Sequence, residues 1–167
     1  TETAGGHTIG ACVTYTEFQD AVAKHYPQMA GYWNRIGGEQ VRNMGTIGAN
    51  VANGSPIGDT PQVIIALGAT LTLRNGTERR TLPVEEFFID YGKQDRQTGD
   101  FVESLHVPHL PEGCQFAAYK VTKRRDEENT ECAGLTGMAS GSRFANCPHG
   151  ARSQLRVLQN PSGNIAV

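Results

Sequence analysis

The sequence predicts an α+β domain in which helices pack on a small, mainly antiparallel sheet. Three observations predict this class. An Asn-Gly turn joins two strand-like runs in the middle of the chain, several helical runs precede it, and two further strand-like runs follow it. The chain has 167 residues, 38% of them hydrophobic and 20 of them glycine, which suits one domain with many loops.

The first elements predicted are a strand and a helix. Residues 7–15 have the composition of a strand that a glycine interrupts. Thr16, followed three residues later by Gln19, is typical of a capping box at the start of a helix. Pro27 ends or kinks that helix, because proline lacks the backbone N–H that the helix interior needs.

A second helix and a glycine-rich stretch come next. The helical spacing of Met29, Trp33 and Ile36 predicts the helix, and Gly37-Gly38 stops it. Residues 42–59 then read RNMGTIGANVANGSPIGD, with far more backbone-permissive residues than a plain loop needs.

The middle of the chain predicts a third helix and a hairpin. Thr60 is expected to be the N-cap and Pro61 the first residue of a helix that ends near Leu67. Residues 71–82 then form two strand-like runs around Asn75-Gly76, which predicts a type I′ turn.

The last elements are shorter. Residues 83–88 predict a short helix, and residues 101–107 and 116–121 predict strands. From residue 129 no period of 3.6 or 2 is sustained. We therefore divide the chain into a domain over 1–128 and a divergent, irregular tail over 129–167.

The glycine-rich stretch has two interpretations. Gly45, Gly48 and Gly54 would let backbone N–H groups approach phosphate oxygens, with side-chain hydrogen bonds added by Thr46 and Asn50. The spacing matches neither G-x-G-x-x-G nor the P-loop, so on the residues alone a glycine-rich corner between strands is the favoured interpretation and phosphate binding stays open. Asp59 either accepts ribose or ribityl hydroxyls or caps the following helix.

Charge and cysteine content exclude several classes of protein. A formal net charge of −2 gives no reason to expect nucleic acid as a partner. The longest apolar run, residues 63–67, is too short to span a membrane. The four cysteines fit no zinc or iron–sulfur spacing, so we expect a cytoplasmic protein with reduced thiols. Because the chain begins at Thr1 without a secretory signal, we expect it to be processed or excised from a longer protein.

Metal binding is not expected from the spacing of the histidines. His7, His25, His106 and His109 are scattered along the chain, and we interpret them as structural. Cys147 and His149 offer only two ligands, which is too few for a metal site.

Two motifs carry a resemblance to a known family. The string NMGTIGAN (residues 43–50) is followed by SPIGD (residues 55–59), and the similarity extends over about residues 1–128. This part of the chain resembles the FAD-binding domain of molybdenum hydroxylases, most of all the small flavin subunit of bacterial xanthine dehydrogenases. In that family a vanillyl-alcohol-oxidase-type domain holds FAD between two subdomains. The resemblance covers the second one only.

The resemblance implies which residues contact the cofactor, and it implies no catalytic residue. Ala49 stands where the family usually has glycine. The residues expected at the diphosphate and adenosine half of FAD are Thr46, Ile47, Gly48, Ala49 and Asn50. Asp59 is expected to face the cofactor. The residues expected around the flavin ring are Ile36, Val102 and Lys120.

The implied activity is the FAD step of a xanthine dehydrogenase-like oxidoreductase. Electrons from purine hydroxylation would pass through iron–sulfur clusters to FAD and then to NAD⁺. The partners expected are a molybdenum-binding large subunit and an iron–sulfur domain, with no nucleic acid and no membrane. The alternatives are a non-catalytic fragment that only packs against partner subunits, and a flavoprotein of the same fold such as a carbon monoxide dehydrogenase medium subunit.

Overall fold

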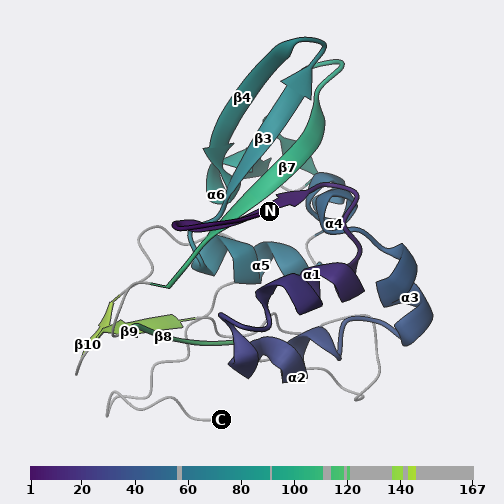
Figure 1. Ribbon diagram of the computed structural model, residues 1–167. Coiled ribbons are helices and arrows are strands. Elements are labelled where there is room, and N and C mark those ends of the chain that lie inside the picture. Colours follow the sequence, from purple (N-terminus) through teal and green to yellow (C-terminus); the bar gives the residue numbers. More distant parts are fainter. Residues whose placement is uncertain are drawn as a thin grey trace.

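The protein has the predicted α+β architecture. A twisted antiparallel sheet lies above a layer of helices, and the N-terminus lies beside the sheet (Figure 1). The Cys147–His149 pair falls outside the described residues. The computed structural model describes residues 1–55, 58–90, 92–110, 114–118, 120, 137–140 and 143–145.

The main sheet has five strands in the order β1-β2-β7-β3-β4, and every neighbouring pair is antiparallel. The long strand β7 therefore lies between two strands that precede it in the chain. Its inner face buries Val102, Leu105 and Val107, which join the hydrophobic core. The strands are β1 (Glu2–Thr3), β2 (Gly6–Gly10), β3 (Thr70–Asn75), β4 (Glu78–Pro83) and β7 (Phe101–Pro108).

Two smaller sheets complete the strands. β5 (Phe88–Asp90) pairs with β6 (Lys93–Gln94). β9 (Gly137–Ser140) lies between β8 (Cys114–Ala117) and β10 (Arg143–Ala145). The sequence did not predict β9 and β10, which lie in the tail after residue 128; the domain boundary itself stays a prediction.

The helices pack against one face of the main sheet. In α5 seven of the eight residues are buried, all except Ile65, so this helix forms the centre of the core. None of the helices in the described ranges is long and apolar enough to cross a bilayer. The helices are α1 (Tyr15–Val22), η1 (Pro27–Met29), α2 (Ala30–Trp33), α3 (Glu39–Met44), α4 (Ile47–Asn53), α5 (Asp59–Ala66) and α6 (Val84–Phe87).

Two helix starts differ from the sequence-based prediction. The capping box of α1 is formed by Thr14 and Glu17, because the chain leaves β2 earlier than expected. Helix α5 begins at Asp59 with Gly58 as N-cap, and Thr60 is already inside the helix.

The hairpin is confirmed, but its loop lies one residue later than expected. Asn75 pairs with Glu78, so the two loop residues are Gly76 and Thr77. Gly76 has a φ of 60°, as the first position of a primed turn requires. The Asn75 side-chain amide donates to the Thr98 carbonyl and to the Asp100 carboxylate, so Asn75 is bound to the segment before β7 and is not one of the loop residues.

Candidate functional site

The glycine-rich stretch forms helices where the sequence suggested a loop. Thr46 is the N-cap of α4, in extended conformation, and its hydroxyl accepts a hydrogen bond of 3.3 Å from the Ala49 N–H. The helix ends at Gly54, whose φ of 61° is the left-handed conformation that glycine adopts without strain. Residues 46–54 are therefore a short helix between its two caps.

Two N–H groups at the start of α4 are used within the protein. The Ile47 N–H donates to the Val13 carbonyl and the Gly48 N–H to the Ala11 carbonyl, each at 3.0 Å. A Cβ on Gly48 would lie 2.3 Å from the Cβ of Ala11. Gly48 therefore lets α4 approach the chain after β2, and this contact accounts for its missing side chain without a phosphate.

At the start of α4 the accessible residues are the N-cap Thr46 and, in the first turn, Ala49 and Asn50. Ala49 is exposed, so its methyl group, at the position where the family usually has glycine, meets no crowding within the chain. The Asn50 amide oxygen is buried and has no hydrogen-bond partner in the described part of the protein. The nitrogen and oxygen of a side-chain amide are exchanged by a flip of the group, so this end of Asn50 can either donate to a phosphate oxygen or accept from a ribose hydroxyl.

Asp59 and Lys120 form a buried ion pair. The Lys120 ammonium lies 2.7 Å from the Asp59 carboxylate, and the side-chain exposures are 0% and 7%. The same ammonium donates to the Arg35 carbonyl at 2.9 Å, and the Arg35 guanidinium donates back to the Lys120 carbonyl at 2.5 Å. Lys120 is thus fixed against α5 and the end of α2, with its charge neutralised.

Ile36 follows Arg35 directly and is buried. The Arg42 guanidinium donates to the carbonyls of Ile36 and Gly37, which holds the turn after α2. The structure therefore brings Ile36, Asp59 and Lys120, predicted from distant parts of the sequence, into one neighbourhood.

Two tyrosines in this neighbourhood were not predicted. Tyr32 donates from its hydroxyl to the Asp59 carbonyl at 2.8 Å, and burial, followed by the Asp59 charge, raises the pKa of that hydroxyl. Tyr15 accepts from the Thr60 hydroxyl at 3.2 Å, and burial is the main cause that raises its pKa to about 12. Both hydroxyls are therefore neutral. The sequence could not predict these two tyrosines, because they lie far from Asp59 along the chain and meet its neighbourhood only through packing of the folded protein.

Val102 lies apart from the ion pair, on the buried face of β7 opposite Leu73. The backbone carbonyl of the next residue, Glu103, accepts from the Ala11 N–H at 3.0 Å, and the Ala11 carbonyl accepts from the Gly48 N–H. Val102 is thus linked to α4 through the chain after β2.

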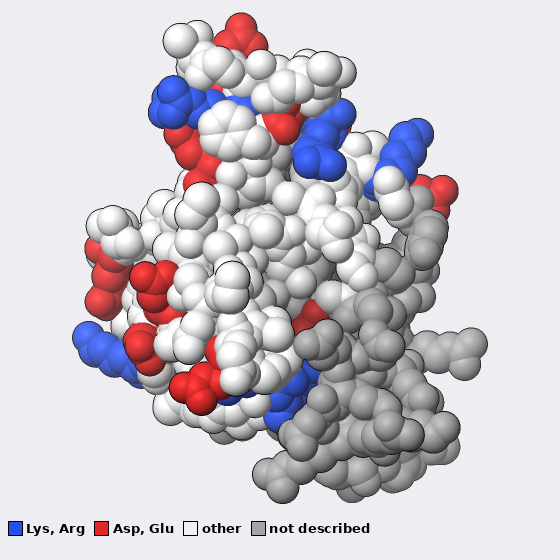
Figure 2. All heavy atoms as spheres, turned by 90° about the vertical axis from the view of Figure 1, so that its right-hand side faces the viewer, with Lys and Arg blue, Asp and Glu red and all other residues white. Residues whose placement is uncertain are grey.

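The centre of the face on the side of α3 and α4 carries few charges. Figure 2 shows charged side chains near the top, at the left-hand edge and near the lower edge of this face, around a central region that is largely uncharged. A ligand on this face would meet mainly neutral donors and apolar surface.

Comparison with known proteins decides the family. Residues 1–110 match the family described as the FAD binding domain in molybdopterin dehydrogenase. The chain belongs to this family. The match confirms the resemblance seen in the sequence and covers the part that contains α4 and the Asp59 end of the ion pair.

Individual relatives come from several enzymes of this group. The chain is 30% identical to xanthine dehydrogenase/oxidase from Gallus gallus, over 76% of this chain and 10% of that protein. It is 36% identical to the glyceraldehyde dehydrogenase medium chain from Sulfolobus acidocaldarius, over 71% of this chain and 43% of that one. A carbon monoxide dehydrogenase chain from Hydrogenophaga pseudoflava has the same fold, with a TM-score of 0.77 and 27% identity over 87% of this chain and 52% of that chain.

These relatives support an FAD-binding part of a molybdenum-hydroxylase-type oxidoreductase. The chain spans about half the length of the medium chains it matches. Because the relatives act on different substrates, the family membership does not by itself select a purine.

Proposed function

We propose that this chain forms one wall of an FAD site in a xanthine dehydrogenase-like oxidoreductase. The observation that carries the proposal is the family match over residues 1–110. FAD held here would supply the redox chemistry, the transfer of electrons from iron–sulfur clusters to NAD⁺. The chain's own contribution is to bind and orient the cofactor.

Different residues have different roles in this proposal. Thr46, Ala49 and Asn50 would contact the diphosphate half, because they are the accessible residues at the start of α4 and one end of the Asn50 amide has no partner among the described residues. Ile47 and Gly48 would instead hold α4 in place, since their N–H groups already donate to backbone carbonyls of the segment after β2.

The flavin ring is placed beside Ile36 and Val102 on the family resemblance alone, because both side chains are buried within this chain. Asp59 and Lys120 order the wall behind it through their ion pair. Because the Lys120 ammonium is paired with the Asp59 carboxylate, we assign Lys120 a role in ordering this wall and not in placing an unpaired positive charge beside the flavin ring.

The finer assignment to purine hydroxylation with NAD⁺ rests on two observations. One is the xanthine dehydrogenase relative. The other is segment 92–97, GKQDRQ, which resembles the xanthine dehydrogenase branch of the family more than the other branches. The partners proposed are a molybdenum-binding large subunit and an iron–sulfur domain, in the cytoplasm. The names of the related medium chains support a protein of several subunits.

The first experiment is a titration of the purified chain with FAD, followed by the visible flavin band. We expect a shifted band, and at least about tenfold weaker binding for Asn50→Ala, as the loss of one good hydrogen bond to a charged group costs about 1.5–3 kcal/mol. Asn53→Ala is the matched control, because Asn53 is an exposed asparagine one turn further along α4. Equal weakening by both variants would contradict the role of Asn50.

A second measurement separates FAD binding from the NAD⁺ assignment. NADH added without oxygen to the FAD-loaded chain should bleach the flavin band if the nicotinamide reaches the ring. Binding of FAD without bleaching would leave the FAD site standing and count against NAD⁺.

The alternative is a chain that binds no FAD and only packs against partner subunits. The bonded N–H groups of Ile47 and Gly48 favour it, because they remove two donors that a phosphate would need. Absence of any shifted band at high FAD would select this alternative.

A further inference from the structure

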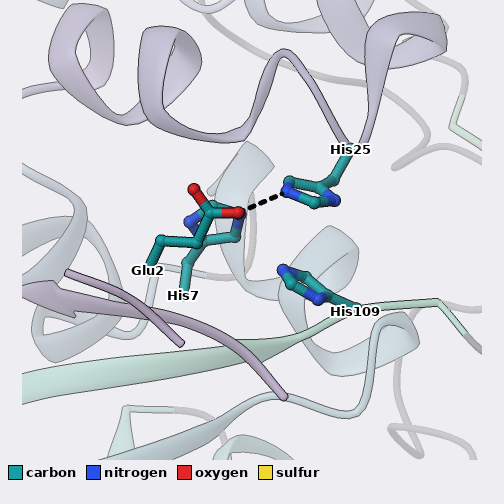
Figure 3. A group of neighbouring side chains, drawn as sticks. All are labelled: Glu2, His7, His25 and His109. Carbon is teal, nitrogen blue, oxygen red and sulfur yellow. Dashed lines mark hydrogen bonds and ion pairs between the residues drawn. The ribbon is translucent and has the colours of Figure 1, made fainter. Parts of the chain in front are cut away.

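Three histidines and one glutamate converge at the N-terminal edge of the main sheet. Glu2 comes from β1, His7 from β2, His25 from the turn after α1, and His109 from the residue after β7. One ligand atom from each lies within 4.8 Å of every other. In Figure 3 the Glu2 carboxylate lies beside His7, with His25 and His109 reaching in from the other side.

The fold holds these residues together through backbone contacts. Glu2 pairs with His7 across the β1-β2 ribbon, so both side chains lie on one face of it. The His109 N–H donates to the Gly5 carbonyl at 3.0 Å. The Tyr26 hydroxyl donates to the Pro108 carbonyl, which joins the residue after His25 to the residue before His109. The strand pairing and these two hydrogen bonds therefore bring the segments that carry the four residues together.

The polar atoms of the cluster are incompletely satisfied. The His25 Nε2 lies 2.9 Å from the Glu2 carboxylate, whereas the Nε2 atoms of His7 and His109 are buried and have no hydrogen-bond partner among the described residues. The ring centroids are 4.0 Å apart for His25 and His109, and 4.9 Å and 5.2 Å from His7 to each of these. Buried nitrogens without partners cost free energy that a bound cation would recover.

We propose that Glu2, His7, His25 and His109 form a binding site for one divalent transition-metal ion of the zinc class. Three imidazole nitrogens and one carboxylate oxygen are a common donor set for tetrahedral Zn²⁺, at about 2.0–2.2 Å from the metal, which places donors about 3.4 Å apart. The donors must close from at most 4.8 Å to that spacing, a change that side-chain rotation supplies.

Such a site would be structural. All four positions are filled by protein ligands, which leaves none open for a substrate. The metal would join the β1-β2 ribbon, the turn after α1 and the end of β7. Lys24 lies 3.9 Å from the Glu2 carboxylate, but its side chain is 78% exposed, so it can turn into solvent when the metal binds.

The test is a titration of the metal-free chain with Co²⁺, followed by visible absorption, with Zn²⁺ as competitor. We expect one equivalent to give the strong visible bands of tetrahedral Co²⁺, and Zn²⁺ to abolish them. Glu2→Gln and His25→Gln should each weaken metal binding by at least about tenfold. Removing a residue that only hydrogen-bonds to a metal ligand already costs about that much, so removing a ligand itself should cost no less. These two positions are chosen because their side chains are 50% and 24% exposed, so the variants are expected to fold.

Two controls make the result specific. His106→Gln should bind as the parent does, because His106 lies on β7 outside the cluster and bonds Thr8. Cys12→Ser should also be unchanged, since Cys12 is an exposed free thiol. Absence of the cobalt bands, or equal binding by the parent and His25→Gln, would overturn the proposal.

Discussion

Gly48 shows how a single missing side chain positions α4. A Cβ at this residue would lie 2.3 Å from the Cβ and 2.5 Å from the Cα of Ala11. We expect Gly48→Ala to lower the free energy of unfolding by about 1–3 kcal/mol, because one segment must move to relieve the overlap. Urea denaturation measures this. Gly31→Ala, on α2 where a Cβ meets nothing within 4 Å, should be neutral or slightly stabilising; an equal loss at both sites would contradict the argument.

The Asp59–Lys120 pair makes a second prediction for single residues. Asp59→Asn would keep the shape but leave the Lys120 ammonium, which is fully buried, without a counter-charge. We expect a loss of about 3–5 kcal/mol in the free energy of unfolding.

The double variant Asp59→Asn, Lys120→Met separates charge from shape. It should recover part of the loss, because no unpaired charge remains. A single-variant loss below about 1 kcal/mol, typical of a surface ion pair, would show that the pair is solvated.

The capping box of α1 makes a prediction about pH. The Thr14 N–H donates to the Glu17 carboxylate, and this bond first, then the one from the Thr14 hydroxyl, lowers the pKa of Glu17. A lowered folded-state pKa means that the contribution to stability is present above the ordinary glutamate pKa and is lost as pH falls through the lowered value.

We therefore expect Glu17→Gln to lower the melting temperature at neutral pH and to match the parent near about pH 3. Melting curves across this range measure the difference. Glu86→Gln, at an exposed glutamate in α6, is the matched control and should show no such convergence. A constant difference at all pH values would mean that the charge of Glu17 plays no part.

The elements that the sequence predicted well are those set by local residues. The hairpin β3-β4 follows from two strand-like runs around a glycine, and only its loop moved by one residue. The capping box moved from Thr16 and Gln19 to Thr14 and Glu17 because a second Thr lies two residues earlier with a Glu at the same spacing. Local patterns thus identify an element but not its first residue.

At the scale of the molecule, the sequence could not predict which distant segments meet. The position of β7 between β2 and β3 depends on packing over the whole core, and it brings His109 to His7. Asp59 and Lys120 meet for the same reason. The family resemblance named both residues as cofactor contacts, but nothing local in the sequence indicated that they pair with each other. The cofactor contacts themselves remain predictions.

The central place of β7 leads to a prediction about local stability. β7 is hydrogen-bonded on both sides, to β2 and β3, whereas β1 and β4 are the edges of the sheet. Amides that open only when the core unfolds exchange most slowly. We expect amide hydrogen exchange, measured by mass spectrometry on the chain without added ligand, to be slowest in β7 and β3 and faster in β1 and β4. Exchange in β7 as fast as in β1 would contradict the strand order, because no opening short of unfolding exposes a central strand before an edge.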